Sequence, residues 1–163
     1  MKNSIAICPG SFDPITYGHL DIICRAANMF DKVLVVVASN KSKTNCFTPS
    51  ERVQMIKKCI PDLENVEVES FDGLLADYAA EKGAAAIIKG LRAMSDFEYE
   101  FQMALTNKKL NPKVETLFLT TSAQNMYVSS SMVKQIAAMG GDISSFVPPV
   151  IKQDIIDRIQ SNK

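Results

Sequence analysis

Short apolar runs and segments of helical periodicity alternate along the chain, and this alternation limits the possible folds more than any other feature. Apolar runs of strand length occupy residues 4–8, 31–38, 66–69, 84–88 and 114–119. Segments in which apolar residues recur at helical spacing separate these runs and follow the last one. Such alternation is typical of parallel sheets joined by right-handed crossovers. The sequence therefore predicts an α/β fold, a Rossmann-like five-stranded parallel sheet with helices on both faces and a C-terminal helix.

Turn and capping signals refine the boundaries of these elements. The unbroken aliphatic run 33–37 is typical of a strand buried on both faces, whereas the alternating run 66–69 indicates a strand nearer an edge. Thr48, Pro49 and Glu51 combine an N-cap, a proline at the first helical position and a capping box. Helices are expected at about 20–30, 48–60, 74–82, 95–110, 129–139 and from 148 onward.

Length and composition fit one domain spanning residues 1–163, without a linker or an internal repeat. Basic and acidic residues both count 18, and the zero net charge argues against a broad nucleic-acid-binding surface. The four cysteines form no C-x-x-C pair and the chain has one histidine, so no metal site made by the protein is expected. No secretory signal is visible, and the longest apolar run, 33–38, is too short to span a membrane. A cytoplasmic protein without nucleic-acid or membrane partners is expected.

Residues 8–19, with the sequence CPGSFDPITYGH, join the first predicted strand to the first helix. In open α/β sheets such a loop binds ligands, and the N–H groups of the helix N-terminus favour anions such as phosphate. His19, the only histidine, falls in the first turn of the helix. A protonated imidazole is well placed there only if an anion lies between the ring and the helix end. The alternative interpretation is a solvent-exposed histidine without a special role.

Polar and cationic residues follow four of the five predicted strands. They are Ser11 and His19 after the first strand, Lys43 after the second, Lys89, Gly90 and Arg92 after the fourth, and Ser129, Ser130 and Ser131 after the fifth. Because the carboxyl ends of parallel strands meet at one rim, these groups can converge on one crevice. Cations, hydroxyl groups and helix N-termini that share a crevice suit a polyphosphate ligand.

Several familiar site motifs are missing from the sequence. It contains no G-x-x-x-x-G-K-[ST] phosphate loop, no G-x-G-x-x-G after the first strand and no nucleophile elbow. His19 also has no carboxylate nearby in sequence to orient it. A site of this kind supports catalysis by positioning and electrostatic stabilisation, which is what in-line transfer at phosphorus requires.

Each of these residues also has a purely structural interpretation. Lys43 can be a solvated loop charge, and Ser129 can be only an N-cap. Arg92 can pair with Asp96 or Glu98 on the surface of the next helix. These alternatives remain open for each residue taken alone, although their joint occurrence at one rim favours a site.

The helix predicted over 95–110 carries a stripe of apolar residues, namely Phe97, Phe101, Ala104 and Leu105. A stripe at helical spacing is more often part of the core than a platform on which a ligand stacks. Glu100 lies elsewhere around the same helix, where an exposed charge is the simple interpretation.

Five segments together resemble the bacterial phosphopantetheine adenylyltransferase family: residues 9–14, 18–19, 89–92, 96–100 and 128–131. The stretch from Thr16 to His19 is similar to the phosphate-binding signature of the wider nucleotidyltransferase superfamily. The resemblance covers nearly the whole chain, and the sequence D-F-E-Y-E close after G-L-R makes the narrower assignment specific.

The resemblance implies a reaction of coenzyme A biosynthesis. ATP and 4′-phosphopantetheine would give dephospho-coenzyme A and pyrophosphate, with Mg²⁺ carried by the ATP phosphates. The attacking group would be the substrate phosphate, whose second pKa of about 6 leaves it largely ionised at neutral pH, so no strong general base is needed. His19 would be the catalytic residue that stabilises the transition state at the α-phosphorus. The resemblance further implies a homohexamer that coenzyme A inhibits.

The resemblance also implies which residues contact each substrate. The acceptor would bind to Ser11, Lys43, Leu75 and Lys89. The nucleotide would contact Ser11, Phe12, His19, Gly90, Leu91, Arg92, Glu100, Asn125, Met126, Tyr127, Val128, Ser129, Ser130 and Ser131. Two positions depart from the family pattern, because Ser11 replaces a threonine and Lys89 replaces an arginine, which loses the bidentate fork of the guanidinium.

Two other functions are compatible with parts of this pattern. One is another nucleotidyltransferase of the same fold, acting on nicotinamide mononucleotide or a phosphorylated alcohol. The D-F-E-Y-E segment argues against it. The other is a sensor that binds coenzyme A or ATP without turnover. The retained His19 argues against a sensor, because a protein that only binds has less need of a residue aimed at the reacting phosphorus.

Overall fold

Five parallel strands form one sheet in the order β3-β2-β1-β4-β5 in the computed structural model, which describes residues 4–38, 44–92 and 94–161. The strands are β1 (Ile5–Gly10), β2 (Lys32–Ala38), β3 (Val66–Phe71), β4 (Ala86–Leu91) and β5 (Glu115–Thr120). Every pairing between neighbouring strands is parallel. The predicted sheet is therefore confirmed, and β3 lies at an edge as its alternating sequence indicated.

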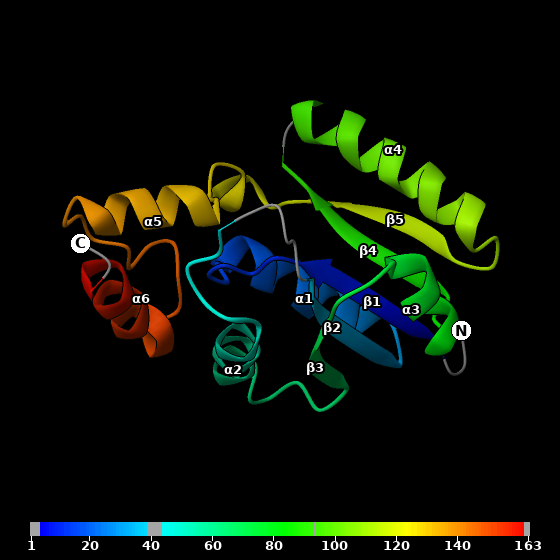
Figure 1. Ribbon diagram of the computed structural model, residues 1–163, viewed down its shortest axis with the longest axis horizontal. Helices are drawn as coiled ribbons and strands as arrows, with labels where there is room; N and C mark the ends of the chain where they lie inside the picture. The colour runs from blue at the N-terminus through cyan, green and yellow to red at the C-terminus, as the bar shows by residue number, and fades with distance from the viewer. Residues whose placement is uncertain (1–3, 39–43, 93, 162–163) are drawn as a thin grey trace.

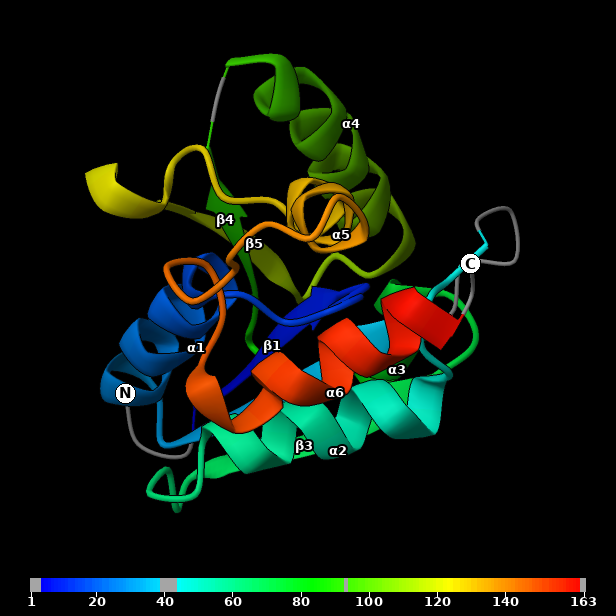
Figure 2. The same cartoon turned by 90° about the vertical axis from the view of Figure 1, so that its left-hand side faces the viewer.

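The helices follow the strands in the predicted order. They are α1 (Tyr17–Met29), α2 (Pro49–Cys59), α3 (Leu75–Glu81), α4 (Met94–Leu110), α5 (Ser130–Ala138) and the C-terminal α6 (Pro149–Ser161), with a short 3₁₀ helix, η1 (Ala123–Asn125), before α5. Figures 1 and 2 both show α2 and α6 side by side. No helix in the described ranges is long and apolar enough to cross a membrane.

Helices cover both faces of the sheet. On one face, Ile23 of α1, Ile56 of α2 and Ile155 of α6 pack with Val35 of β2 in the larger buried cluster, to which α5 also contributes. On the other face, α3 covers a smaller cluster, and α4 lies beside α3 over β4 and β5 (Figure 1). The aliphatic residues of β2 alternate between the two clusters, which explains why its sequence is apolar without interruption.

The start of α2 shows how local sequence sets an element boundary. The Thr48 side chain accepts a hydrogen bond from the Glu51 N–H at 3.3 Å, and the Glu51 carboxylate accepts one from the Thr48 N–H at 2.8 Å. Pro49 takes the first helical position, where a missing N–H costs nothing. The predicted capping box is therefore confirmed.

The ladder between β1 and β4 is much shorter than its neighbours. β1 pairs with β2 along its whole length, from Ile5 to Gly10, whereas it pairs with β4 only at Ala6–Ala86 and Ile7–Ile87. The two strands thus separate toward their carboxyl ends. This is also the place where the strand order reverses, so the sheet opens at its topological switch point, where open α/β sheets bind ligands.

Two sequence predictions need correction. The fourth strand does not end at Ile88, because β4 stays paired with β5 as far as Leu91. The apolar stripe of α4 is not core: Phe97 and Phe101 are exposed, and Leu105 is 57% exposed. The cluster of buried side chains on the α3 and α4 side of the sheet is small, and the apolar side chains of α4 lie largely outside it. An apolar stripe at helical spacing therefore does not by itself prove that the stripe is buried.

Candidate active site

The loop after β1 has an unusual backbone that its side chains support. Phe12 adopts a left-handed conformation with φ of +49°, which costs a non-glycine residue on the order of 1 kcal/mol. Its ring is buried and passes so close to Gly10 that a Cβ there would lie 3.0 Å from two ring atoms. Gly10 therefore leaves the space that the ring needs, while Ser11 between them stays exposed.

His19 is held by the N-terminus of α1. Its Nδ1 accepts a hydrogen bond from the Thr16 N–H at 3.1 Å, so His19 is the N3 residue of a capping box in which Thr16 is the N-cap. The Phe12 ring packs against the imidazole edge to face, with centroids 5.1 Å apart. Because Nδ1 is the acceptor, the neutral ring carries its proton on Nε2, which is left as an N–H donor. His19 is half-buried, so the interpretation as a freely exposed residue is wrong.

The surroundings of His19 keep it neutral. Burial, and after it the positive charge of Arg92, lower the pKa of His19 from 6.5 to about 4. The free protein therefore presents a neutral N–H donor at physiological pH rather than an imidazolium. An anion bound between His19 and Arg92 would offset the charge of Arg92 and favour the protonated ring, which raises this pKa.

Arg92 joins two parts of the predicted site. Its Nε lies 3.4 Å from the Asp96 carboxylate, as the structural interpretation expected. Its Nη1 also donates a hydrogen bond to the Val128 carbonyl at 3.0 Å. The second contact ties the end of β4 to the loop before α5, so these two predicted segments are brought together.

Lys89 and Glu100 form a partly buried ion pair, with Nζ 3.3 Å from Oε2. The interpretation of Glu100 as a simple exposed charge is therefore wrong. Lys89 lies on the α3 and α4 side of the sheet, because side chains alternate along β4 and Ile88 before it belongs to the α1 side. Leu75, at the start of α3, packs on the same side. Two of the residues predicted to bind the acceptor thus share one face.

Gly90 faces the opposite side, toward α1. A Cβ at Gly90 would lie 2.9 Å from Cγ1 of Ile22, so glycine allows α1 to approach β4 closely. His19 lies on the same helix as Ile22. His19 and Gly90, both predicted to contact the nucleotide, therefore lie on the α1 side of the opening, and Leu91 continues the strand between Gly90 and Arg92.

The serines before and within α5 have structural partners of their own. Ser129 is the N-cap of α5, and its Oγ accepts a hydrogen bond from the Met132 N–H at 3.2 Å. Ser130 donates its hydroxyl to the Pro14 carbonyl at 2.7 Å, which attaches α5 to the loop after β1. Ser131 is exposed. The cap interpretation of Ser129 is confirmed, and the helix N-terminus lies beside the loop that carries Ser11.

The residues predicted in the segment before α5 differ in their exposure to solvent. Asn125 is buried and its amide donates to the Ser122 hydroxyl at 2.9 Å. Met126 and Tyr127 are largely exposed, and Tyr127 contacts Phe146 edge to face. Lys43 lies outside the described residues.

Asp13 is a residue of the site that sequence reasoning missed. Its buried carboxylate accepts hydrogen bonds from the N–H groups of Cys46 and Phe47, both at 2.9 Å, and from Lys134 of α5 at 3.0 Å. One carboxylate thus fastens three segments far apart in the sequence. Its only sequence signal was its place between Phe12 and a proline in the motif.

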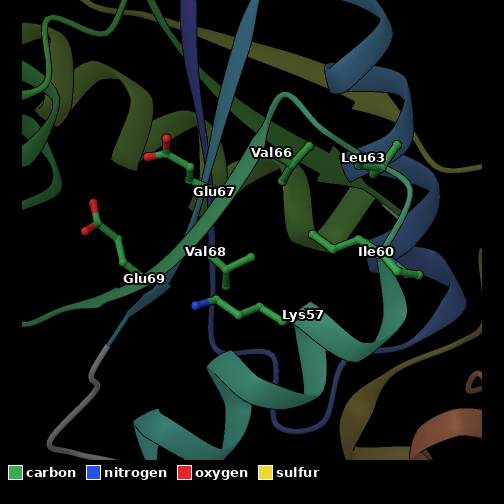
Figure 3. A pocket seen from close by; sticks show the side chains of 8 residues that line it. Lys57, Ile60, Leu63, Val66, Glu67, Val68 and Glu69 are labelled. Carbon is green, nitrogen blue, oxygen red and sulfur yellow. The ribbon is translucent and has the colours of Figure 1, made fainter.

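A separate hollow with a volume of about 430 Å³ lies between the end of α2 and the edge strand β3 (Figure 3). Figure 3 shows Val66 and Val68 turned toward Lys57 and Ile60, while Glu67 points away from them. The hollow lies beside the beginning of β3 and contains none of the predicted site residues.

Comparisons with known proteins agree with this geometry. A family model described as cytidylyltransferase-like matches residues 7–136. A phosphopantetheine adenylyltransferase of Caldanaerobacter subterraneus subsp. tengcongensis is 55% identical over 158 residues, which cover 97% of this chain and 99% of the relative. One of Clostridium tetani is 58% identical over 152 residues, which cover 93% and 95%. These relatives confirm the family resemblance.

A solved structure supports the fold independently of close sequence similarity. The nicotinic acid mononucleotide adenylyltransferase of Plasmodium falciparum, complexed with NaAD, matches with a TM-score of 0.68 at 17% identity. The match covers 98% of this chain and 96% of that one. At this identity the likeness shows the shared fold alone.

Proposed function

The chain belongs to the cytidylyltransferase-like family and to the phosphopantetheine adenylyltransferases, and we propose that it transfers the adenylyl group of ATP to 4′-phosphopantetheine. The products are dephospho-coenzyme A and pyrophosphate, and the reaction belongs to coenzyme A biosynthesis. The observation that carries the proposal is the hydrogen bond from the Thr16 N–H to Nδ1 of His19, which leaves Nε2 as a fixed donor at the opening between β1 and β4.

The reaction needs little covalent chemistry from the protein. A phosphate oxygen of 4′-phosphopantetheine attacks the α-phosphorus of ATP, and the bond from that phosphorus to the oxygen bridging to the β-phosphate breaks. Pyrophosphate leaves with this oxygen. Because the attacking phosphate is already ionised, no protein base has to remove a proton. His19 donates from Nε2 to an oxygen on the α-phosphorus, where negative charge has to be stabilised in the transition state.

The two sides of the opening suit two different substrates. On the α3 and α4 side, Lys89 and Leu75 offer a cation and an apolar surface, which fit a phosphate followed by a pantetheine arm. On the α1 side, Phe12, His19 and Gly90 border the loop that we assign to the nucleotide. Ser11 is the exposed residue of the otherwise buried loop after β1, from which it can reach both substrates, and Lys43 is assigned to the acceptor.

The other nucleotide residues are assigned by their places along the same rim. Arg92 is assigned to the nucleotide, and so is Glu100, although Glu100 pairs with Lys89 on the α3 and α4 side. The segment 125–131 reaches the site through the Arg92 contact with Val128, and we assign it to the adenine and to the β- and γ-phosphates. The N-terminus of α5 adds N–H groups suited to phosphate oxygens.

We propose that Mg²⁺ enters as part of the Mg-ATP substrate. Mg²⁺ prefers carboxylate, carbonyl and water oxygens, and it commonly bridges substrate phosphates. The Asp13 carboxylate already accepts three hydrogen bonds from Cys46, Phe47 and Lys134, so it suits the support of a loop better than the binding of an ion. In the described ranges no group of three or more histidine, cysteine, aspartate or glutamate side chains is placed to hold a metal ion.

We further propose a cytoplasmic homohexamer that coenzyme A inhibits. The exposed apolar side chains of α4, namely Phe97, Phe101 and Leu105, support association of copies through this helix. The four cysteines are free thiols, as expected in a reducing compartment. Sedimentation equilibrium tests the assembly, and inhibition by added coenzyme A tests the regulation.

The first test measures pyrophosphate release from Mg-ATP while the acceptor is varied. Release that depends on 4′-phosphopantetheine, and not on nicotinamide mononucleotide or a phosphorylated alcohol, is the expected result. Release with one of the other acceptors instead would move the chain to another reaction of the same fold. Binding of ATP without release of pyrophosphate, whichever acceptor is added, would indicate a sensor that binds the nucleotide without turnover.

A further inference from the structure

Arg52 of α2 is a buried guanidinium directly beneath the loop that follows β1. The side chain is 1% exposed. Its Nη1 donates a hydrogen bond to the Ser11 carbonyl at 2.7 Å, and its Nε lies 3.4 Å from the carbonyl of Thr48, the N-cap of α2. Nη2 is buried without a partner among the described residues. Burial lowers the pKa of Arg52, and the charge of Asp13 opposes this effect.

The contact with Ser11 fixes the orientation of a whole peptide group. The carbonyl of Ser11 and the N–H of Phe12 belong to one trans peptide, in which the two groups point in opposite directions. Since Arg52 holds the carbonyl on the inner side, the Phe12 N–H is turned to the outer side of the loop. An outward N–H at the end of a parallel strand is suited to a phosphate oxygen.

The same contact supports the conformation of Phe12 and, through it, of His19. Phe12 has a φ of +49°, a conformation that persists in a non-glycine residue only when its surroundings hold it. The Phe12 ring packs edge to face on His19 at 5.1 Å. Rotation of the Ser11 peptide would displace the ring and so disturb the setting of the imidazole.

We propose that Arg52 is a positioning residue for adenylyl transfer, which holds the Ser11 carbonyl so that the Phe12 N–H faces the phosphate site and the Phe12 ring sets His19. The inference rests on the proposed function, because it adds a residue to that reaction. Arg52 touches neither substrate and acts through Ser11 and Phe12. Burying a guanidinium that bonds a loop carbonyl, with Nη2 unpaired among the described residues, is energetically costly, and the need to fix the orientation of this loop explains the arrangement.

Arg158 offers a matched control for Arg52, because it supports the structure without contacting the loop after β1. Arg158 of α6 also donates to a loop carbonyl, that of Cys46 at 2.9 Å, and it binds Glu51 and lies over the Phe47 ring at 5.1 Å. It holds no atom of Ser11 or Phe12. Arg158→Met should therefore lower thermal stability without changing the environment of His19.

The experiment compares Arg52→Met, Arg52→Lys and Arg158→Met with the wild type. Because the chain has one histidine, the titration of its ring protons by NMR reports His19 alone, without any substrate. In Arg52→Met we expect the ring resonances to shift and the pKa of His19 to rise from about 4 toward 6.5. We expect kcat for pyrophosphate release to fall ~10-fold or more, with KM for 4′-phosphopantetheine changed less than ~3-fold. Arg52→Lys should lie between wild type and Arg52→Met, since it keeps one donor.

Two outcomes overturn the proposal. One is an unchanged His19 titration in folded Arg52→Met, or in Arg52→Lys if the methionine variant does not fold. The other is a loss of activity that matches only the fraction of unfolded protein, as a structural residue would give. A wild type that releases no pyrophosphate would reject the proposed function instead, and the His19 titration would still test the role of Arg52 in setting the loop.

Discussion

The Nζ of Lys89 lies 3.3 Å from Oε2 of Glu100, so two residues that the family resemblance assigns to different substrates form one ion pair in the free protein. We expect Lys89→Ala to raise KM for 4′-phosphopantetheine by ~10-fold or more and to change kcat less, because the lost cation binds the acceptor phosphate in both the ground and the transition state. Steady-state kinetics with each substrate varied in turn checks this. Lys108→Ala is the matched control, since Lys108 also pairs with a glutamate, Glu115, but on the surface. An effect on KM for ATP alone would contradict the division of the site into two sides.

Replacement of His19 should lower the turnover rate much more than it weakens the binding of ATP. His19→Asn keeps a side-chain acceptor for the Thr16 N–H but lacks the Nε2 donor, so we expect kcat to fall ~10²-fold or more while the Kd for ATP changes little. His19→Ala removes the acceptor as well and should also lower the thermal stability. Turnover and calorimetric binding of ATP are measured on both variants. Near-normal turnover of His19→Asn would remove the role assigned to Nε2.

The pKa of His19 gives the protein a specific dependence on pH. Folding lowers this pKa from 6.5 to about 4, so the unfolded chain takes up a proton at a higher pH than the folded chain. Between these values the unfolded state is favoured as the pH falls, and the stabilising contribution is complete only above about 6.5. We therefore expect the wild type to lose more stability than His19→Asn between pH 6.5 and 4, measured by urea unfolding. Parallel curves for the two proteins would show that His19 is not kept neutral by the fold.

Loss of Lys134 should destabilise the loop after β1. Lys134→Met leaves the Asp13 carboxylate buried with only two N–H donors, and we expect unfolding to become easier by about 2 kcal/mol. Chemical denaturation measures this change. Lys58→Met provides the control, because the exposed pair of Lys58 with Asp154 should contribute less than about 1 kcal/mol. Equal effects of the two substitutions would mean that Asp13 does not depend on its cation.

Much of the fold could be predicted because its signals are local. The capping box of Thr48 and Glu51 is complete within four residues, and β2 is apolar on both faces because it lies inside the sheet. The position of His19 in the first turn of α1 followed from the turn before it. These signals depend on neighbours in the chain, so the sequence displays them directly.

The parts that could not be predicted depend on residues far apart in the chain. Arg52 looks like an ordinary helix charge, and its sequence neighbours do not show that it is buried and bonded to the carbonyl of Ser11, 41 positions earlier. The partners of Asp13 lie 33 and 34 positions away along the chain, with a third, Lys134, 121 positions away. Periodicity also misled the interpretation of Phe101, because a core stripe and an exposed stripe have the same spacing.

The short ladder between β1 and β4 has a consequence for solvent exchange. Beyond Ile7 and Ile87 the two strands no longer bond to each other, so their amide groups that point into the gap are not protected by a partner strand. Amides of β4 that point the other way remain bonded to β5 as far as Leu91. Hydrogen–deuterium exchange should therefore be fast on one side of β4 and slow on the other. Exchange rates would then alternate between neighbouring residues of β4, and slower exchange of the amides that point into the gap would show that a ligand fills the crevice.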